Sequence, residues 1–196
     1  MRTRDEVKER TISDLAIRMI AKEGLERFSL QKLARQAGVS PATLYIYYKD
    51  KEDLIHSIGS KVSDALFEHS LIGFHHRMNF AEGLRVQWQN RARYLIDHPT
   101  EVQFYEVLRH SNHYRDIQAR TTRSFKGVMN AFVQQAIANG ELKALPFEVY
   151  WSIAFAPLYQ LIKFHNQGYS YVNPDFRLSE DLMMQTLDLV LHALKP

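Results

Sequence analysis

The chain has 196 residues, of which 45% are hydrophobic and 12% aromatic, and this is enough apolar material for a packed core. It contains no cysteine, which excludes a disulfide framework, a thiolate metal site and a cysteine nucleophile. The net charge is +3, but residues 1–51 hold eleven Lys/Arg against seven Asp/Glu, a surplus of +4, whereas the remaining residues hold fourteen against fifteen. A basic N-terminal segment predicts a polyanion partner for that segment, and an ordinary solvated surface is the alternative interpretation.

No stretch of the sequence has the properties of a targeting or membrane segment. The first ten residues are mostly charged, and no apolar run approaches the roughly 20 residues that a membrane span requires. We therefore expect a soluble protein of the cytoplasm that has no membrane partner.

The N-terminal quarter of the sequence predicts three short helices, at about 7–23, 30–37 and 41–48. Each predicted boundary carries a residue that suits it. Glycine allows the chain to turn sharply after a helix, and serine caps a helix N-terminus with its hydroxyl. The residues in these roles are Gly24, Ser29, Gly38 and Ser40.

Beyond residue 50 the sequence predicts helices nearly throughout. Asp50 and Asp53 resemble a capping arrangement for a long helix that runs to Leu71. Further helices are expected at 80–96, 99–109, 114–138, 147–166 and 179–194, and Pro157 should kink the helix that contains it. There is no strand alternation and no internal repeat, so the predicted fold class is all-α, with a three-helix module at 1–50 and a larger helical domain at 51–196.

The segment 41–48 has two different faces when it is drawn as a helix. At 100° per residue, Leu44 and Tyr48 fall together and are predicted to be buried. The opposite face has no charge, which is unusual for a solvated helix, and consists of Ala42, Thr43, Ile46 and Tyr47. A small side chain, a hydroxyl and an aliphatic group that can touch a thymine methyl suit insertion into the major groove of DNA.

Groups that can contact DNA phosphates surround this uncharged face. Lys49 and Lys51 follow it, and the phenolic hydroxyls of Tyr45 and Tyr47 can donate to phosphate oxygens. Packing of Tyr47 on the first helix is the alternative for that residue. From spacing alone, a helical hairpin with a purely structural role is the other interpretation of the whole segment.

Four short motifs in this region point to a known family. They are Phe28-Ser29, Ala34-Arg-Gln-Ala-Gly-Val-Ser40, Thr43-Leu-Tyr-Ile-Tyr-Tyr48 and Lys51. With them, residues 12–58 resemble the N-terminal DNA-binding domain of TetR/AcrR-type bacterial transcriptional regulators, with Ala42 in place of the usual glycine and Tyr48 in place of the usual phenylalanine. The resemblance implies a helix-turn-helix domain that binds double-stranded operator DNA. The residues assigned to DNA binding are Ser29, Ser40, Pro41, Ala42, Thr43, Tyr45, Ile46, Tyr47 and Lys51.

The predicted helix at 147–166 is apolar nearly all round, so it must be covered on every side. In the resembling family the last two helices form a four-helix bundle with their mates from the other subunit. The resemblance therefore implies a homodimer through the helices 147–166 and 179–194, and burial inside a single chain is the alternative.

The middle helices interleave aromatic with basic side chains. A pocket lined by such residues suits an apolar or aromatic small molecule that bears an anionic group, which Arg109 could hold. The resemblance also implies a small-molecule effector for this domain, and plain core packing is the alternative for each residue. The candidate ligand-binding residues are Trp88, Arg91, Tyr105, Arg109, His113, Phe125, Met129, Phe155 and Tyr159.

The sequence offers no chemistry for a metal site, a cofactor or an enzyme. His110 and His113 are spaced as helical metal ligands could be, and His75-His76 is a second pair, but no carboxylate or thiolate completes a familiar ligand string. Phosphate-binding glycine loops and nucleophile motifs are missing from the sequence, so no catalytic residue is expected. The resulting hypothesis is a repressor that a small molecule releases from its operator. An architectural DNA-binding protein and an enzyme that uses the C-terminal cavity are the alternatives, and the small basic surplus weighs against the first of them.

Overall fold

The computed structural model of this protein describes residues 5–196, without the side chains of residues 120–125. All regular structure among these residues is helical, which confirms the predicted all-α fold class. The chain divides into two compact units, Met1–Ala65 with His98–Thr122 and Leu66–Asp97 with Arg123–Pro196. The division predicted between residues 50 and 51 rests on the sequence motifs and stays a prediction.

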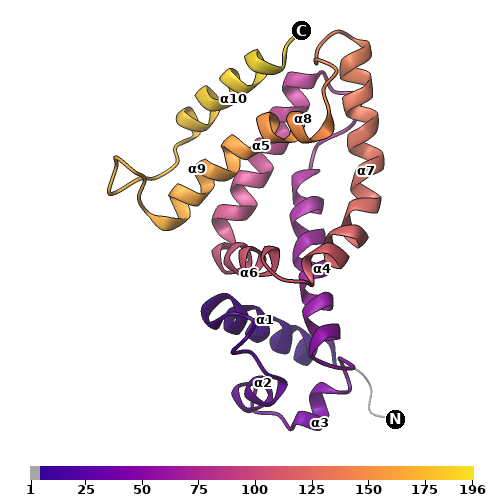
Figure 1. The fold of residues 1–196 in the computed structure, drawn as a ribbon, viewed down its shortest axis with the longest axis vertical. Helices are drawn as coiled ribbons and strands as arrows, with labels where there is room; N and C mark the ends of the chain where they lie inside the picture. The colour runs from indigo at the N-terminus through magenta and orange to yellow at the C-terminus, as the bar shows by residue number, and fades with distance from the viewer. Residues whose placement is uncertain (1–4) are drawn as a thin grey trace. The chain divides into compact units, whose positions relative to one another are not determined.

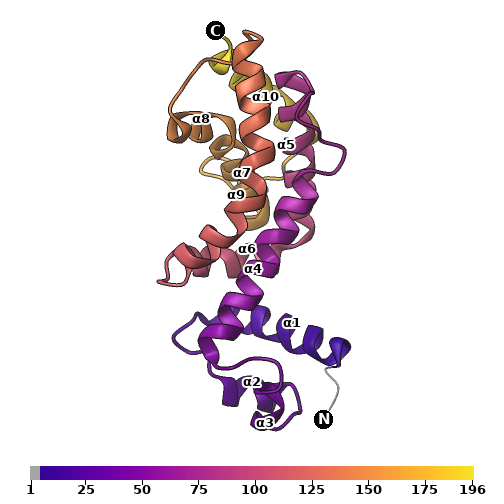
Figure 2. The ribbon, with the colours of Figure 1, turned by 90° about the vertical axis from the view of Figure 1, so that its right-hand side faces the viewer.

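The first unit is built around three short N-terminal helices: α1 (Glu6–Glu23), α2 (Leu30–Gln36) and α3 (Pro41–Leu44). The first part of α4 (Lys51–Ser70), α6 (Pro99–Arg109) and the start of α7 (Tyr114–Ala138) complete it. Helix α1 packs on α2 and α6, and α2 lies against α3 (Figures 1 and 2). The buried core of the first unit includes Ile12, Ala16, Ile20, Leu33, Leu44, Tyr48, Leu54, Ile58, Phe104, Leu108 and Ile117.

The helix ends of this unit are satisfied locally, as the sequence predicts. The Ser29 and Ser40 hydroxyls accept the backbone N–H groups of the third residue beyond each of them, both at 3.3 Å. At the start of α4, a carboxylate oxygen of Asp50 accepts the Asp53 N–H at 2.8 Å, and the Asp53 carboxylate accepts the N–H of Lys49 at 2.9 Å. Gly24 has φ 81°, a value that side-chain-bearing residues rarely adopt, and this ends α1.

Helix α3 is shorter than the predicted segment 41–48, because only Pro41–Leu44 is α-helical. The chain continues as a turn in which the Ile46 N–H donates to Thr43 and the Tyr47 N–H to Leu44, each three residues back. Four β-branched or aromatic residues in succession have modest helix propensity, and this favours a tightened turn over a further helical turn. The uncharged face predicted for an eight-residue helix is therefore divided between a short helix and the turn after it.

The second unit consists of the end of α4, α5 (Phe80–Asp97), most of α7, α8 (Phe147–Ala154), α9 (Ala156–Gln167) and α10 (Glu180–Leu194). Helices α9 and α10 lie side by side and are joined by the loop 168–179, while α5 packs on α9 (Figure 1). The buried residues of the second unit include Leu84, Trp88, Phe132, Tyr150, Phe155, Leu158, Ile162, Leu187 and Leu194. None of the helices among residues 5–196 is long and apolar enough to cross a membrane.

The kink predicted at Pro157 is present as a complete break between α8 and α9. Proline has no N–H to donate, and its ring collides with the carbonyl four residues earlier in a continuous helix. The backbone at Phe155, with φ −128° and ψ −29°, leaves the helical region, and Pro157 then lies in the first turn of α9. Residues 147–166 therefore form two short helices that can face different neighbours.

Burial within the chain accounts for only part of the apolar surface of α8–α10. Tyr150 and Leu158 are covered, but Phe147 is 65% exposed, and on α10 Leu189 is 72% exposed whereas Leu187 is fully buried. Internal core packing therefore explains only some of the apolar residues of these helices, and the subunit contact expected for the others stays a prediction.

We predict that the buried hydrogen bond between Tyr48 and Ser13 stabilises the first unit. The two hydroxyls are 2.8 Å apart, and both residues are at most 5% exposed. Tyr48→Phe or Ser13→Ala leaves one buried hydroxyl without this partner and should lower the free energy of unfolding by about 1–3 kcal/mol. The double variant should lose less than the sum of the single losses, as measured by urea unfolding. Tyr45→Phe removes an exposed hydroxyl and serves as the control, and strictly additive losses at 13 and 48 would contradict the prediction.

Candidate nucleic-acid interface and ligand site

The surface around α3 has the two faces that the sequence predicts. Leu44 and Tyr48 are 0% and 2% exposed, so both belong to the core of the first unit. Pro41, Ala42, Tyr45 and Ile46 are exposed, and Thr43 is half-buried. This surface presents aliphatic, aromatic and hydroxyl groups without charge, which are the groups that can read base edges in a major groove.

Two capping serines border this surface. Ser29 precedes α2 and Ser40 precedes α3, and each uses its hydroxyl oxygen to accept a backbone N–H. The Ser40 hydroxyl is also 3.0 Å from that of Thr43. A hydroxyl has two acceptor lone pairs and one proton, so capping leaves the Ser29 proton able to donate to a phosphate oxygen.

Two residues from the predicted DNA-binding set also have roles in the fold. Tyr47 is half-buried and packs against the core of the first unit, as the alternative for this residue proposes. The Lys51 ammonium group donates to the Leu25 carbonyl at 3.0 Å and lies 5.8 Å from the centre of the Phe28 ring. Lys51 therefore joins α4 to the segment before α2, whereas Lys49 is exposed.

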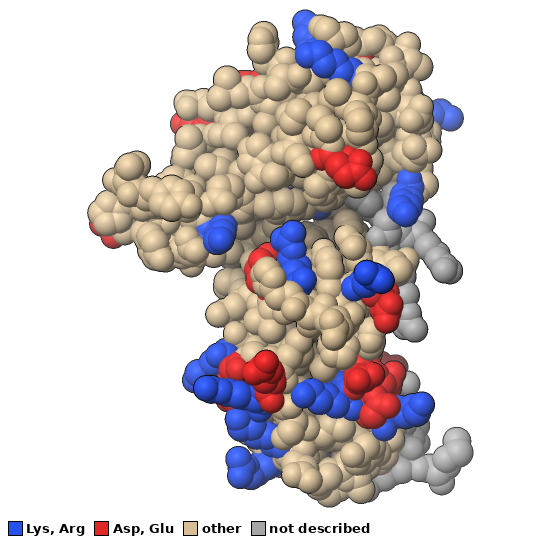
Figure 3. All heavy atoms as spheres, in the orientation of Figure 1, with Lys and Arg blue, Asp and Glu red and all other residues tan. Residues whose placement is uncertain are grey.

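Charges on the first unit are mixed, not uniformly basic. Figure 3 shows basic and acidic side chains close together on the part of the surface formed by this unit. Lys32 pairs with Glu23, and that hydrogen bond lowers the pKa of the Glu23 carboxyl despite the opposing effect of desolvation. Lys61 pairs with Glu9 at 3.1 Å. These pairs mix acidic with basic groups on the surface of the unit, which favours selective contacts over binding by charge alone.

One exposed basic residue beside the interface is missing from the sequence-based set. Arg35 lies in the last turn of α2, next to the turn that leads into α3. A position on the solvated side of α2 is compatible with a phosphate contact, but in the sequence this charge resembles any other surface arginine.

Four of the predicted ligand-binding residues lie together in the second unit. The Arg91 guanidinium donates to the Tyr159 hydroxyl at 2.8 Å and lies 4.8 Å from the centre of the Phe155 ring. The Trp88 indole N–H donates to the Ala154 carbonyl at 2.8 Å. Arg91 and Trp88 are both 0% exposed, so α5 carries a buried charge toward α8 and α9.

The other predicted ligand-binding residues are divided between the two units. Tyr105, Arg109 and His113 belong to the first unit. Met129 is buried in the second unit, and the Phe125 side chain lies outside the described residues. Arg109 pairs with Glu106 of its own helix at 3.1 Å and is half-exposed, so the arginine predicted to hold an anion already has a carboxylate partner.

In the first unit, Tyr105 and His113 have neighbours of their own. Burial raises the pKa of Tyr105 to about 12, and its hydroxyl is 3.5 Å from that of Ser63. The His113 ring meets His56 with 3.4 Å between ring nitrogens. Among the residues whose side chains are described, no group of three or more His, Asp or Glu is placed to hold a metal ion.

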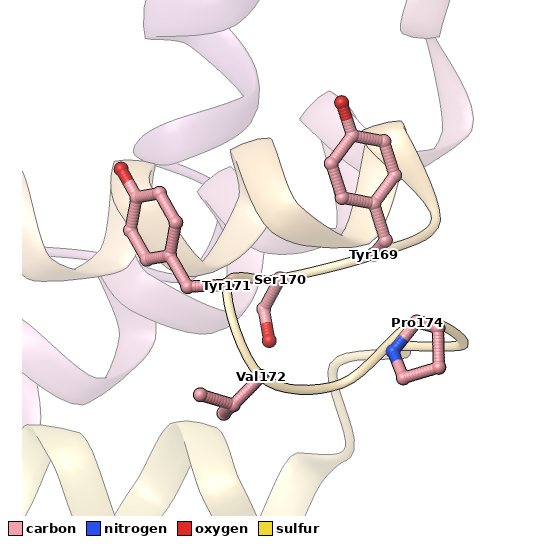
Figure 4. Close-up of a pocket in the computed structure, with 5 residues that line it drawn as sticks. All are labelled: Tyr169, Ser170, Tyr171, Val172 and Pro174. Carbon is pink, nitrogen blue, oxygen red and sulfur yellow. The ribbon is translucent and has the colours of Figure 1, made fainter.

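A surface hollow of about 350 Å³ lies on the loop 168–179, lined by Tyr169, Ser170, Tyr171, Val172 and Pro174. Figure 4 shows that these side chains point in different directions and do not converge on one point. The lining has no charged group, and Tyr171 and Val172 are more than 90% exposed. A loop surface of this kind has few means of selecting a ligand, so we do not assign the ligand site here.

Comparison with known proteins places these features in a family. Residues 12–58 match the bacterial regulatory proteins of the tetR family. The whole chain is similar to the crystal structure of a TetR family transcription regulator from Marinobacter aquaeolei VT8. The TM-score is 0.86 and the identity 32%, and the similarity covers 100% of this chain and 99% of that one.

Other relatives share parts of the chain. An uncharacterized HTH-type transcriptional regulator of Haemophilus influenzae is 32% identical over 83 residues, which are 42% of this chain and 44% of that protein. The fatty acid metabolism regulator protein of Bacillus subtilis is 27% identical over 136 residues, 67% of this chain and 69% of that protein. The fold is also similar to that of the transcriptional regulator FadR from Bacillus subtilis in complex with stearoyl-CoA, with a TM-score of 0.74 and 20% identity over 95% of this chain and 99% of that one.

We predict that acid pH loosens the loop 168–179 where it is anchored to α9. The Leu178 N–H donates to Nδ1 of His165 at 3.0 Å, and only a neutral imidazole can accept it. Burial, together with repulsion from Arg177, lowers the pKa of His165 below its ordinary value of 6.5. The anchor is therefore complete above pH 6.5 and is lost as the pH falls through the lowered pKa of the folded protein.

The measurement is hydrogen exchange at the Leu178 amide, corrected for its intrinsic rate. Protection should be constant above pH 6.5 and should fall at lower pH. In the His165→Gln variant the amide oxygen can accept the same bond at any pH, so the pH dependence should disappear. An unchanged pH dependence in this variant would contradict the role given to His165.

Proposed function

This chain belongs to the tetR family of bacterial regulatory proteins, and on that premise we propose that it is a transcriptional repressor. It binds operator DNA in the cytoplasm through α2, α3 and the turn after α3, and a small-molecule effector bound in the second unit releases it. The single observation that carries the proposal is the exposed, uncharged surface of Ala42, Tyr45 and Ile46, with Leu44 and Tyr48 buried behind it.

The proposal divides the interface into residues that read bases and residues that hold the backbone. Ala42, Thr43 and Ile46 face the base edges, where a methyl group or a hydroxyl distinguishes one base pair from another. Ser29, Tyr45 and Lys49 supply donors for phosphates on either side. Lys51 contributes by fixing the start of α4, because its ammonium group is bound to the Leu25 carbonyl.

We further propose that the protein acts as a homodimer through α8, α9 and α10. Phe147 and Val149 at the start of α8 and Leu189 on α10 are exposed apolar side chains on helices whose other large apolar residues are buried or half-buried. A second copy of the chain would cover them and form a four-helix bundle. Two linked recognition surfaces could then contact two half-sites about one DNA turn, roughly 34 Å, apart.

The effector proposal rests on the buried aromatic cluster of the second unit and on what relatives bind. A similar fold, that of FadR from Bacillus subtilis, was solved in complex with stearoyl-CoA, a ligand that includes a long apolar acyl chain. We propose an apolar or aromatic effector that favours the state unable to bind DNA. Helix α4 belongs to the first unit up to Ala65 and to the second from Leu66, and α7 is divided in the same way after Thr122. We propose that α4, which follows the DNA-binding helices directly in the chain, passes such a preference to them.

The DNA-binding part of the proposal predicts different effects from different residues. A consensus operator is first selected from random double-stranded DNA with the full chain. Thr43→Ala and Ile46→Ala should then change the base preferred at particular positions, because a mismatched base pair costs about 1–3 kcal/mol. Lys49→Ala should weaken binding to all sequences alike and reduce the slope of log K against log salt concentration by about one unit.

Lys51→Ala should be measured beside Lys49→Ala. Lys51→Ala removes the hydrogen bond to the Leu25 carbonyl, so we expect it to lower the free energy of unfolding as well as DNA affinity. Equal, sequence-independent losses from the variants at 43, 46 and 49 would contradict the assignment of α3 as the base-reading element. Binding that shows no sequence preference in the unmodified chain would favour an architectural protein instead.

The dimer proposal predicts that Leu189→Glu gives a folded monomer. Leu189 is 72% exposed, so a carboxylate there costs the single chain little, whereas at a subunit contact it would be buried without a partner. Sedimentation at micromolar concentration should show the monomer, with unchanged helix content by circular dichroism. The matched control is Leu187→Glu, which places the charge in the core of the chain and should unfold it. A Leu189→Glu protein that stays dimeric would exclude this surface.

A further inference from the structure

Two histidine rings of the first unit meet edge to face. His56 lies on α4, and His113 lies in the segment between α6 and α7. The ring planes cross at 83°, and Nε2 of His56 is 3.4 Å from Nδ1 of His113. Both residues are half-buried, so a solute can reach the rings. The sequence pairs His113 with His110, whereas the fold sets it against His56, 57 residues away.

The packing of α4 on the start of α7 holds the two rings together. Gly59 follows His56 by three residues on α4, and a Cβ at Gly59 would lie only 2.5 Å from Cδ1 of Ile117. Ile117 is 0% exposed and follows His113 by four residues, and its N–H donates to the His113 carbonyl at 3.2 Å. Residues three and four apart share a helix face, so the close contact at Gly59 also brings the two histidines together.

The separation of the two ring nitrogens matches a shared metal ion better than a hydrogen bond. Hydrogen bonds that an N–H donates to oxygen are about 2.7–3.2 Å long, shorter than this separation of 3.4 Å. Zinc holds imidazole nitrogens at about 2.0–2.1 Å in a tetrahedron, so two nitrogens at its corners are about 3.3–3.4 Å apart. The two nitrogens therefore have the spacing of one edge of a zinc site.

The distance between the ring centres agrees with this spacing. With the nitrogens 3.4 Å apart, a head-on hydrogen bond would place the ring centres about 5.7 Å apart. Two imidazoles whose nitrogens point at one tetrahedral metal ion have their centres about 5.2 Å apart. The centres of His56 and His113 are 5.3 Å apart. This arrangement suits two lone pairs that meet at one point between the rings.

The ligand atoms select a class of metal. Imidazole nitrogen suits Zn²⁺, Cu²⁺ and Ni²⁺, whereas Mg²⁺ and Ca²⁺ prefer oxygen ligands. The chain has no cysteine, and among the described side chains no group of three His, Asp or Glu could compete for the ion. Two protein ligands leave the other positions of the tetrahedron to water or to a donor atom of a small molecule.

We propose that the first unit binds one zinc ion between Nε2 of His56 and Nδ1 of His113. The ion joins α4 to the segment that leads into α7, so it stabilises the folded first unit. This inference does not rest on the proposed function, because neither histidine belongs to the surface assigned to DNA or to the subunit contact.

The test is a calorimetric titration of Zn²⁺ into the full chain, without an affinity tag and at about pH 7.5, where imidazole is neutral. One ion should bind per chain. His56→Gln and His113→Gln each remove one ligand and should weaken binding at least ten-fold. His110→Gln changes an exposed histidine close to His113 in the sequence and should leave the affinity unchanged. The double variant His75→Gln/His76→Gln, which removes an exposed adjacent pair, should also leave it unchanged.

A measurement on the unmodified chain keeps the test decisive if a variant does not fold. NMR of the ¹⁵N-labelled histidine rings reports which ring nitrogen binds a metal and which carries the proton. Addition of Zn²⁺ should shift Nε2 of His56 and Nδ1 of His113, and the other nitrogen of each ring should keep its proton. A purely structural contact between the two rings predicts no such shift.

The inference is overturned if the unmodified chain does not bind Zn²⁺ at one ion per chain, or if the affinity survives in His56→Gln or His113→Gln. Shifts at other ring nitrogens in place of these two would also overturn it. Binding that is lost only in the double variant at 75 and 76 would identify an adventitious ion only, with the same consequence. Operator selection and zinc binding are separate measurements, so either proposal can fail while the other stands.

Discussion

The direction of α3 depends on one buried contact, the packing of Leu44 and Tyr48 with the hydrogen bond from Tyr48 to Ser13. A helix of four residues has too few internal hydrogen bonds to hold a conformation by itself. Its orientation is set by side chains that enter the core beneath it. Because these two residues point inward, Ala42, Tyr45 and Ile46 point outward, and the surface offered to DNA is a consequence of what the core requires.

The two units differ in whether their buried polar side chains find hydrogen-bond partners. In the first unit, the two hydroxyls at 13 and 48 satisfy each other, and a satisfied buried pair specifies a fold. In the second unit, the buried amide of Gln87 and hydroxyl of Tyr150 have no hydrogen-bond partner among the described side chains and backbone. A buried polar group without a partner costs stability, whereas a satisfied pair does not.

The break at Phe155 decides which apolar residues of the C-terminal helices stay exposed. It divides the apolar segment 147–166 into α8 and α9, and each helix buries some apolar residues in the chain and leaves others exposed. Phe147 and Leu189 lie on the uncovered side, while Phe155 covers the Arg91 guanidinium. The break therefore lets the two halves of one apolar segment face different neighbours.

The sequence by itself determined the local features of this protein: where most helices begin and end, the all-α class, and which residues of 41–48 face inward. Caps, helix breakers and the 3.6-residue period act within a few positions, so they can be recognised without the fold. The tertiary structure alone decided what depends on distant partners. Lys51 reaches a carbonyl 26 residues away, and Arg91 a hydroxyl 68 residues away. Burial of Arg91, but not of Arg109, follows from such long-range packing, and no local pattern distinguishes two arginines on amphipathic helices.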